Sequence, residues 1–173
     1  MKRVRYSVAM SLDGYIAGLS GNYEWIPTDP GLDFGAFFKK IDTVVMGRRT
    51  FEVALSQGSA AMPGMRAVVA SRTLRPADYP DVTITADAAP TIASLRLEEG
   101  KDIWLMGGGD LFKNILAAGL VDTVEVGVIP ILLGEGLPLL PTITQSTRLK
   151  LTKHEAFSSG VVLLQYDVVR EEK

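Results

Sequence analysis

A short junction between an expected strand and an expected helix carries residues that suit a phosphate group. Gly47 ends an apolar segment and is followed by Arg48, Arg49 and Thr50. A glycine at a strand end lets backbone N–H groups approach a ligand closely, and a helix N-terminus adds unpaired donors and a partial positive charge. Two arginines and a hydroxyl at such a place favour an anion-binding site. The alternative is that Gly47 makes only a tight turn and the arginines are solvated.

A second junction holds three glycines in a row, Gly107, Gly108 and Gly109, ahead of Asp110. Because it lacks side chains, this surface would let a flat ring or a pyrophosphate lie against the backbone. The carboxylate of Asp110 would repel a phosphate placed very close to it, although it could cap the following helix. The alternative reading is a permissive turn followed by an N-cap at Asp110.

Ser71 and Arg72 come directly after another apolar segment and could bind a phosphomonoester. In open α/β sheets, ligands bind outside the carboxyl ends of the strands. Together with Arg48 and Arg49, these residues point to the 2′-phosphate that distinguishes NADP from NAD. The Rossmann dinucleotide fingerprint is not matched, because Phe112 occupies its sixth position, and no Gly-Lys-Ser/Thr of a P-loop occurs.

The composition excludes several other chemistries. The 173 residues include no cysteine and one histidine, so disulfides, thiolate metal sites and multi-histidine metal sites are excluded. His154 lies in an alternating segment, where we expect a solvated strand position rather than the base of a Ser-His-Asp triad. The net charge of −2, with both signs scattered, predicts neither a nucleic-acid surface nor a membrane anchor. Without a secretory or membrane-spanning apolar run, we expect a cytoplasmic protein.

Alternating strand and helix patterns would position these junctions. The expected strands cover residues 4–10, 42–46, 66–71, 82–85, 102–106, 121–129, 148–157 and 161–169. The expected helices cover residues 33–40, 48–57, 90–99 and 110–118. Residues 11–32 and 130–141, which are rich in glycine and proline, are expected to form loops.

Short apolar strands that alternate with helices predict a mostly parallel sheet covered on both faces. The last two strands flank Ser158, Ser159 and Gly160, which predicts an antiparallel hairpin. With 47% apolar and 22% charged residues and no linker, residues 1–173 are expected to form one domain. The expected fold class is therefore α/β, with a mixed, mostly parallel central sheet, helices on both faces and a C-terminal antiparallel hairpin.

The order of these pieces resembles the dihydrofolate reductase superfamily over nearly the whole chain. The matching segments are residues 11–14, 45–51, 71–72, 107–109, 120–122 and 130–136. The segments near the C-terminal end are similar to the pyrimidine reductases of riboflavin biosynthesis, which form the C-terminal domain of bacterial bifunctional deaminase-reductases. The resemblance implies a single-domain dihydrofolate-reductase-like fold, NADPH as the cofactor and a small-molecule substrate.

The resemblance also implies which residues bind the cofactor. They are Ala9, Ile16, Gly47, Arg48, Arg49, Thr50, Ser71, Arg72, Gly107, Gly108 and Gly109. The first two would hold the nicotinamide carboxamide through their backbone, and the 47–50 segment would surround the adenosine phosphates. The serine and arginine at 71–72 would bind the 2′-phosphate. The triple glycine would lie beside the pyrophosphate and the nicotinamide, with a cis peptide bond between Gly107 and Gly108.

The substrate side matches the family less well. Trp25 corresponds to an aromatic position in a mobile loop near the substrate, and Phe37 in the following helix is a second substrate-binding candidate. True folate reductases carry a carboxylate in that helix, but the aligned position here is Phe34. Residues 51–57 also differ from the segment with which pyrimidine reductases recognise the ribose phosphate.

We expect hydride transfer from the cofactor to a polar C=N or C=O carbon of a small heterocycle or opened sugar, with a proton from an acid or a fixed water. Asp33 is the first catalytic candidate and Asp13 the second, the alternatives being a helix cap and a turn residue. Folate reductase activity, a non-catalytic NADPH-binding module and a structural homo-oligomer remain alternatives. A homodimer is expected, because this branch is usually dimeric and residues 128–140 are apolar for a loop.

Overall fold

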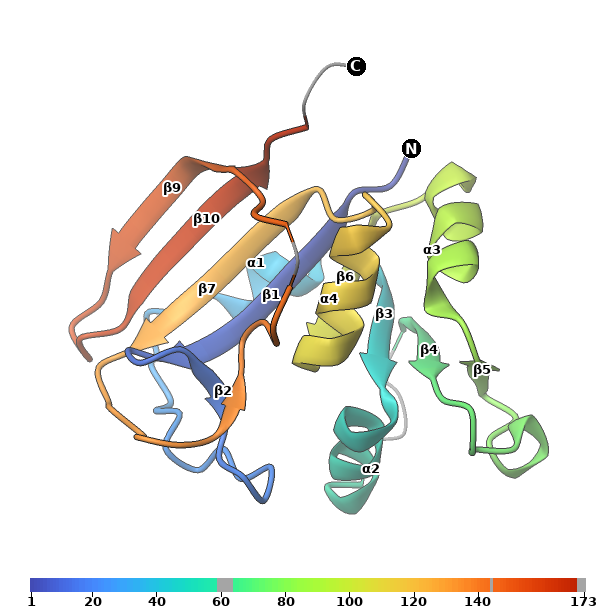
Figure 1. Ribbon diagram of the computed structural model, residues 1–173, viewed down its shortest axis with the longest axis horizontal. Coiled ribbons are helices and arrows are strands. Elements are labelled where there is room, and N and C mark those ends of the chain that lie inside the picture. Colours follow the sequence, from blue (N-terminus) through green and yellow to red (C-terminus); the bar gives the residue numbers. More distant parts are fainter. Residues whose placement is uncertain (59–63, 144, 171–173) are drawn as a thin grey trace.

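An eight-stranded sheet forms the centre of the computed structural model, which describes residues 1–58, 64–143 and 145–170 (Figure 1). Its strand order is β5-β4-β3-β6-β1-β7-β10-β9. The bounds of these strands are Val4–Ser11 (β1), Ile41–Gly47 (β3), Arg66–Ala70 (β4), Val82–Thr85 (β5), Asp102–Gly107 (β6), Thr123–Ile129 (β7), Leu149–Ala156 (β9) and Val162–Val168 (β10). The strands β5, β4, β3, β6, β1 and β7 pair in parallel, whereas β10 pairs antiparallel with both β7 and β9. The predicted mixed sheet and terminal hairpin are therefore confirmed.

The helices are α1 (Phe34–Phe38), α2 (Arg48–Ser56), α3 (Ala88–Leu97) and α4 (Gly109–Ala117), with a short 3-10 turn at Pro76–Asp78. Successive side chains of a strand point to opposite faces of the sheet, so neighbouring residues pack into two separate hydrophobic clusters. Val45 packs in a cluster with Ile92 of α3 and Phe112 of α4. Val44 packs in the second cluster, with Phe51 of α2. The sheet is therefore covered on both faces, as predicted, and α4 lies in front of it in Figure 1 while α1 lies behind.

Two very short strands lie in segments that the sequence predicts as loops. Tyr15–Ala17 (β2) pairs antiparallel with Leu137–Pro138 (β8) and ties the segment after β1 to the segment after β7. Strands of two or three residues are too short to leave an alternating pattern, which explains why they were missed. Gly136 permits this pairing, since a Cβ on it would lie 2.4 Å from the carbonyl oxygen of Ala17.

Two helix starts differ from the prediction. The helix expected from Pro90 begins at Ala88, because Asp87 caps it by accepting a hydrogen bond from the N–H of Ala89. Pro90 then falls within the first turn, where proline is tolerated. The N-cap of α4 is Gly108 rather than Asp110, and Asp110 lies in the first helical turn.

His154 lies on β9, where every residue is exposed, so the predicted solvated strand position is confirmed. Among the described residues, no group of three or more histidine, aspartate or glutamate side chains is arranged to hold a metal ion. The same part of the chain contains no helix that is both long and apolar enough to cross a bilayer.

Candidate active site

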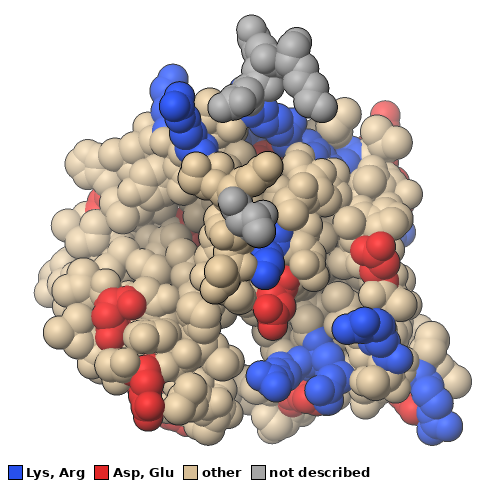
Figure 2. Space-filling view, in the orientation of Figure 1, with Lys and Arg blue, Asp and Glu red and all other residues tan. Residues whose placement is uncertain are grey.

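A cleft of about 800 Å³ opens at the carboxyl ends of the parallel strands. The strands β3, β4 and β6 end there at Gly47, Ala70 and Gly107, all of which line it. The starts of α2 and α4 form one side, and segments after β1 and β7 contribute the other. Figure 2 shows an opening between α2 and the part of the molecule around β2. This is the edge of an open α/β sheet where ligands are expected.

The first glycine junction lies in this cleft. Gly47 is the N-cap of α2, with extended backbone (φ −78°, ψ 164°) and no side-chain hydrogen bond to the helix start. The first-turn N–H groups of α2 therefore keep no side-chain cap, and Arg48, Arg49 and Thr50 line the cleft beside them. The structure thus brings together all four residues that the sequence grouped as a phosphate site.

The two arginines differ in their partners. Arg48 donates a hydrogen bond of 2.9 Å from Nη1 to Glu52 Oε1, one turn further along α2, and both side chains are about half exposed. Arg49 makes no salt bridge with any acidic residue in the described part of the chain. Figure 2 shows basic side chains gathered over α2 on this face. Cationic groups are therefore available where a phosphate would meet the helix start.

The three glycines of the second junction also line the cleft, but they differ in their surroundings. The predicted cis peptide bond between Gly107 and Gly108 is present. Gly107 has a φ of +141°, which other residues rarely adopt, and a Cβ on Gly107 or Gly108 would meet no atom within 4 Å. A Cβ on Gly109 would instead lie 2.6 Å from the carbonyl oxygen of Pro138. The first two glycines therefore keep space open in the cleft. The lack of a side chain on Gly109 instead allows the 138–141 segment to pack against the backbone.

Ser71 and Arg72 do not line the cleft, although they follow Ala70, which does. The hydroxyl of Ser71 accepts hydrogen bonds from the N–H groups of Thr73 (3.2 Å) and Leu74 (3.0 Å). Arg72 is exposed at the start of the same turn. The structure therefore places the pair beside the cleft rather than inside it, with the serine engaged in its own turn.

The cleft lining also includes residues that the sequence did not single out. Ala9 and Ile16, both expected at the nicotinamide, line the cleft together with Ser7, Trp104 and Met106. The indole Nε1 of Trp104 donates a hydrogen bond of 3.0 Å to the carbonyl oxygen of Ser7. Trp104 and Met106 are two residues apart on β6, just before the triple glycine. That period-two spacing ahead of a ligand-facing turn is the signal that could have found them.

The two aromatic substrate candidates are not part of the cleft lining. The ring of Phe37 meets Trp104 edge-on, with centroids 5.3 Å apart and an interplanar angle of 86°. Trp25 donates from Nε1 to the carbonyl oxygen of Asn22 (3.3 Å). Neither ring lines the cleft, but Tyr23 and Ile26, on either side of Trp25 in the chain, do.

Both candidate catalytic carboxylates are engaged in local structure, outside the cleft lining. Asp33 caps α1 by accepting a hydrogen bond of 2.8 Å from the N–H of Ala36. Asp13 accepts hydrogen bonds from the hydroxyl of Ser11 (2.7 Å) and from the N–H groups of Gly134 (2.7 Å) and Leu133 (3.1 Å). The bond from Ser11, with those from the two N–H groups, lowers the pKa of Asp13 despite some desolvation. The geometry therefore favours the capping and turn alternatives for these residues.

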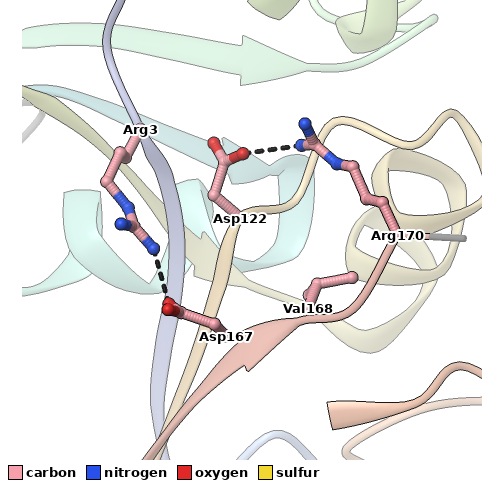
Figure 3. Close-up of a pocket in the computed structure, with 5 residues that line it drawn as sticks. All are labelled: Arg3, Asp122, Asp167, Val168 and Arg170. Atoms are coloured by element: carbon pink, nitrogen blue, oxygen red, sulfur yellow. Dashed lines mark hydrogen bonds and ion pairs between the residues drawn. The ribbon is translucent and has the colours of Figure 1, made fainter. Parts of the chain in front are cut away.

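A second hollow, of about 310 Å³, lies at the opposite edge of the sheet, where β1 and β7 begin (Figure 3). Arg3 is paired there with Asp167 (2.5 Å), and Arg170 is paired with Asp122 (2.6 Å). Asp122 also accepts from Arg96 and from the N–H of Val4. These charges satisfy one another, and the hollow lacks the glycine-lined backbone of the cleft, so we place the functional site in the cleft.

Comparison with known proteins supports this view of the fold. Dihydrofolate reductase from Schistosoma mansoni aligns with a TM-score of 0.68 over 97% of this chain and 99% of its own, at 20% identity. The deaminase and 5-amino-6-(5-phosphoribosylamino)uracil reductase from Thermotoga maritima aligns with a TM-score of 0.69 over 97% of this chain and 57% of its own, at 20% identity. These likenesses show the fold alone: the structure is of the dihydrofolate-reductase-like class.

The family follows from nearer matches. The model of the RibD C-terminal domain matches residues 2–163, and the chain belongs to this family. The Bacillus subtilis protein YyaP, which is uncharacterized, is 32% identical over 177 residues, covering 95% of this chain and 94% of its own. A candidate riboflavin biosynthesis protein from Shewanella sp. PV-4 is 30% identical, with a TM-score of 0.83 over 98% of this chain and 100% of its own. The resemblance to the pyrimidine reductase branch is thereby confirmed.

Proposed function

We propose that this protein is an NADPH-dependent reductase that transfers hydride to a carbonyl or imine carbon of a small, ring-containing substrate. The observation that carries the proposal is the pair of glycine junctions in one cleft, with two arginines at the start of α2. Open space at Gly107 and Gly108 leaves room for a ring or a pyrophosphate against the backbone. When bound, the cofactor would supply the hydride, while the protein would supply orientation and electrostatics.

The proposed roles differ from one part of the cleft to another. At the start of α2, the residues proposed to hold the adenosine phosphates are Gly47, Arg48, Arg49 and Thr50. The two arginines would also meet the 2′-phosphate, together with Ser71 and Arg72 beside the cleft. The glycines of the second junction would flank the pyrophosphate, and the backbone of Ala9 and Ile16 would orient the nicotinamide. These proposed cofactor-binding residues are the ones that the family resemblance implies.

A proton must reach the reduced group after hydride arrives. The sequence offers Asp33 and Asp13, but the carboxylates of both accept bonds from backbone N–H groups. The lowered pKa of Asp13 keeps its carboxylate ionised at neutral pH, so it holds no proton to give. We therefore propose a water held in the cleft as the proton source.

The test is oxidation of NADPH, followed by absorbance, with pterins, ribosylaminopyrimidine phosphates and simple carbonyls as acceptors. Turnover of at least one carbonyl or imine acceptor supports the reductase. Turnover of dihydrofolate alone would identify the folate-reductase alternative. Tight NADPH binding without turnover of any acceptor would favour the non-catalytic module.

We also propose a homodimer, with a contact surface other than the 128–140 segment expected from the sequence. In the 128–140 segment, Leu139 and Leu140 pack against the main core, whereas Leu132 is 70% exposed. A second group of exposed apolar residues lies on the neighbouring strands β9 and β10, where Leu149, Leu151 and Val162 are 43%, 47% and 36% exposed. Figure 1 shows no helix over these two strands on the side that carries α4. Exposed apolar residues of this kind tend to be covered by a partner.

A further inference from the structure

The geometry points to an uncharged, flat substrate without a phosphate group, with Trp104 as the surface on which it stacks. This inference rests on the proposed reductase function and narrows its substrate class. It differs from the reaction named for the Thermotoga maritima neighbour, a 5-amino-6-(5-phosphoribosylamino)uracil reductase whose substrate carries a phosphoribosyl group.

The charges that line the cleft are confined to the starts of two helices. Among the described residues, the charged lining residues are Arg48, Arg49 and Asp110, all in the first turns of α2 and α4. The part of the cleft lined by β1, β6 and the 21–26 segment includes Ser7, Ala9, Tyr23, Ile26, Trp104 and Met106. None of these carries a charge. If the cofactor phosphates occupy the two arginines, a second phosphate among these uncharged residues would be desolvated with no cation to meet it, which is costly.

Arg5 packs near this part of the cleft, because its guanidinium lies against Phe37, which contacts Trp104, and its charge is already paired. Its Nη2 lies 2.6 Å from Glu125 Oε1 and its Nη1 3.4 Å from Asp102 Oδ2. The guanidinium also lies 5.2 Å from the ring centre of Phe37, and the side chain is only 12% exposed. Removing it from Glu125 would leave a buried carboxylate unpaired, so Arg5 is held away from a substrate phosphate.

The indole ring of Trp104, which lines the cleft, is fixed by a hydrogen bond and by aromatic contacts. Its only polar group, the indole N–H, is donated to the carbonyl oxygen of Ser7. Phe37 packs against the ring edge-on, and Phe38 packs at 5.8 Å with a 46° tilt. The remaining surface of the indole that faces the cleft is therefore apolar and aromatic. Such a surface binds flat rings by stacking.

The loop that contributes Tyr23 and Ile26 to the cleft lining is also anchored. Ser159, in the turn between β9 and β10, donates a hydrogen bond to Asp29 Oδ2, and the N–H of Gly31 donates to Asp29 Oδ1 (2.7 Å). Tyr23 and Ile26 precede this anchor and line the cleft. A flat substrate would therefore lie between Trp104 and this loop, with hydroxyls of Ser7 and Tyr23 as its polar neighbours.

Reduction of the substrate needs a two-electron donor, and a bound reduced nicotinamide would be that donor. The bound cofactor would supply the hydride, so that a C–H bond of its dihydronicotinamide ring would break as a C–H bond forms at the electrophilic carbon of the substrate. The C=O or C=N π bond breaks, its electron pair moves to the heteroatom, and that atom takes a proton from water. The substrate is reduced by two electrons and the cofactor is oxidised.

The first experiment compares matched acceptors by kcat/KM in NADPH oxidation. The pair is a ribosylaminopyrimidine with and without its 5′-phosphate, and a neutral naphthoquinone is a third probe. We expect the phosphorylated compound to be at least about tenfold poorer than its neutral counterpart. A phosphorylated substrate that is tenfold better would overturn the inference.

The second experiment uses Trp104→Ala and Trp104→Phe. We expect Trp104→Ala to raise KM for the neutral acceptor about tenfold, with the Kd of NADPH within about twofold of wild type, and Trp104→Phe to restore most of the loss. An unchanged KM in a folded Trp104→Ala protein would contradict the assignment. Quenching of tryptophan fluorescence by the naphthoquinone is measured without cofactor, so failure of NADPH binding refutes the proposed function separately. Absence of saturable quenching would refute the stacking site.

Discussion

Gly109 lies directly against the carbonyl oxygen of Pro138, so that a Cβ at position 109 would approach this oxygen to 2.6 Å. The δ carbon of Pro141 would lie 2.9 Å from the same Cβ. Both contacts involve a segment held by β8 and by the hydrogen bond from the N–H of Leu139 to the carbonyl oxygen of Gly14. The third glycine is thus required for packing, whatever binds in the cleft.

Gly109→Ala is therefore expected to destabilise the fold. Overpacking of this kind costs about 1–3 kcal/mol and lowers Tm by several degrees in a chain of this size. Thermal unfolding followed by circular dichroism measures the shift. A Tm equal to that of wild type would show that the 138–141 segment moves freely, contrary to the packing described here.

Gly108→Ala is the matched variant with the opposite expectation. Position 108 has an ordinary φ of −86° and open space around the added methyl, so the loss of stability should stay within about 1 kcal/mol, the usual cost at an N-cap. The methyl would project where a ligand approaches the backbone, and we expect NADPH to bind at least about tenfold more weakly. Unchanged affinity in a titration would remove this glycine from the cofactor site.

Arg48→Ala should separate the two nicotinamide cofactors. A charge-assisted bond to the 2′-phosphate contributes roughly 1.5–3 kcal/mol, so NADPH should bind about 10- to 100-fold more weakly while NADH barely changes. Glu52→Gln is the control, since it removes the carboxylate that holds Arg48 and leaves the cation in place. Arg72→Ala, measured in parallel, reports how much the turn beside the cleft contributes to the affinity for NADPH. Equal losses for both cofactors would mean that Arg48 supports the fold or the pyrophosphate instead.

Asp13→Asn should reveal a structural carboxylate. The hydrogen bonds to Asp13 lower its pKa, so its stabilising contribution is present above the ordinary aspartate pKa of about 3.9 and is lost as pH falls through the lower folded value. The Tm of wild type should exceed that of the variant near neutral pH, and the two should converge in acid. We also expect kcat to fall far less than the roughly 100-fold of a missing proton donor. A loss of that size, with Tm unchanged, would make Asp13 the catalytic acid.

Leu151→Lys tests the proposed dimer surface. The residue lies on the edge strand β9 and is nearly half exposed, so the substitution should leave the monomer fold intact. A lysine on an edge strand opposes association with another chain. Light scattering at micromolar concentration should show a dimer for wild type and a monomer for the variant. A monomeric wild type would refute the proposed assembly.

The elements around the cleft were largely readable from the sequence, because each has a strong local pattern. The buried strand before Gly47 and the apolar face of α4 gave clear periodicity, and the glycines marked the two junctions. Partners brought together only by the tertiary fold were not readable. The Asp13 contacts to Gly134 and Leu133 join residues about 120 positions apart, and no local rule predicts them.

The substrate end shows the same limit. Trp104 reads as an ordinary core residue of a buried strand, and its place in the cleft depends on the neighbouring strand β1, whose Ser7 carbonyl binds its indole N–H. Trp25 was the more visible candidate because it lies in a long loop, yet its ring bonds to Asn22 within that loop. Long-range sheet register, rather than residue type, decided which tryptophan lines the cleft.

The central claim is that this cleft binds NADPH in preference to NADH. Calorimetric titration of the wild-type protein with each cofactor, at one fixed salt concentration, tests it directly. We predict saturable binding of both, with NADPH at least about tenfold tighter, as expected for a single charge-assisted contact to the 2′-phosphate. Equal affinity for the two cofactors, or no binding of either to well-folded protein, would contradict the account.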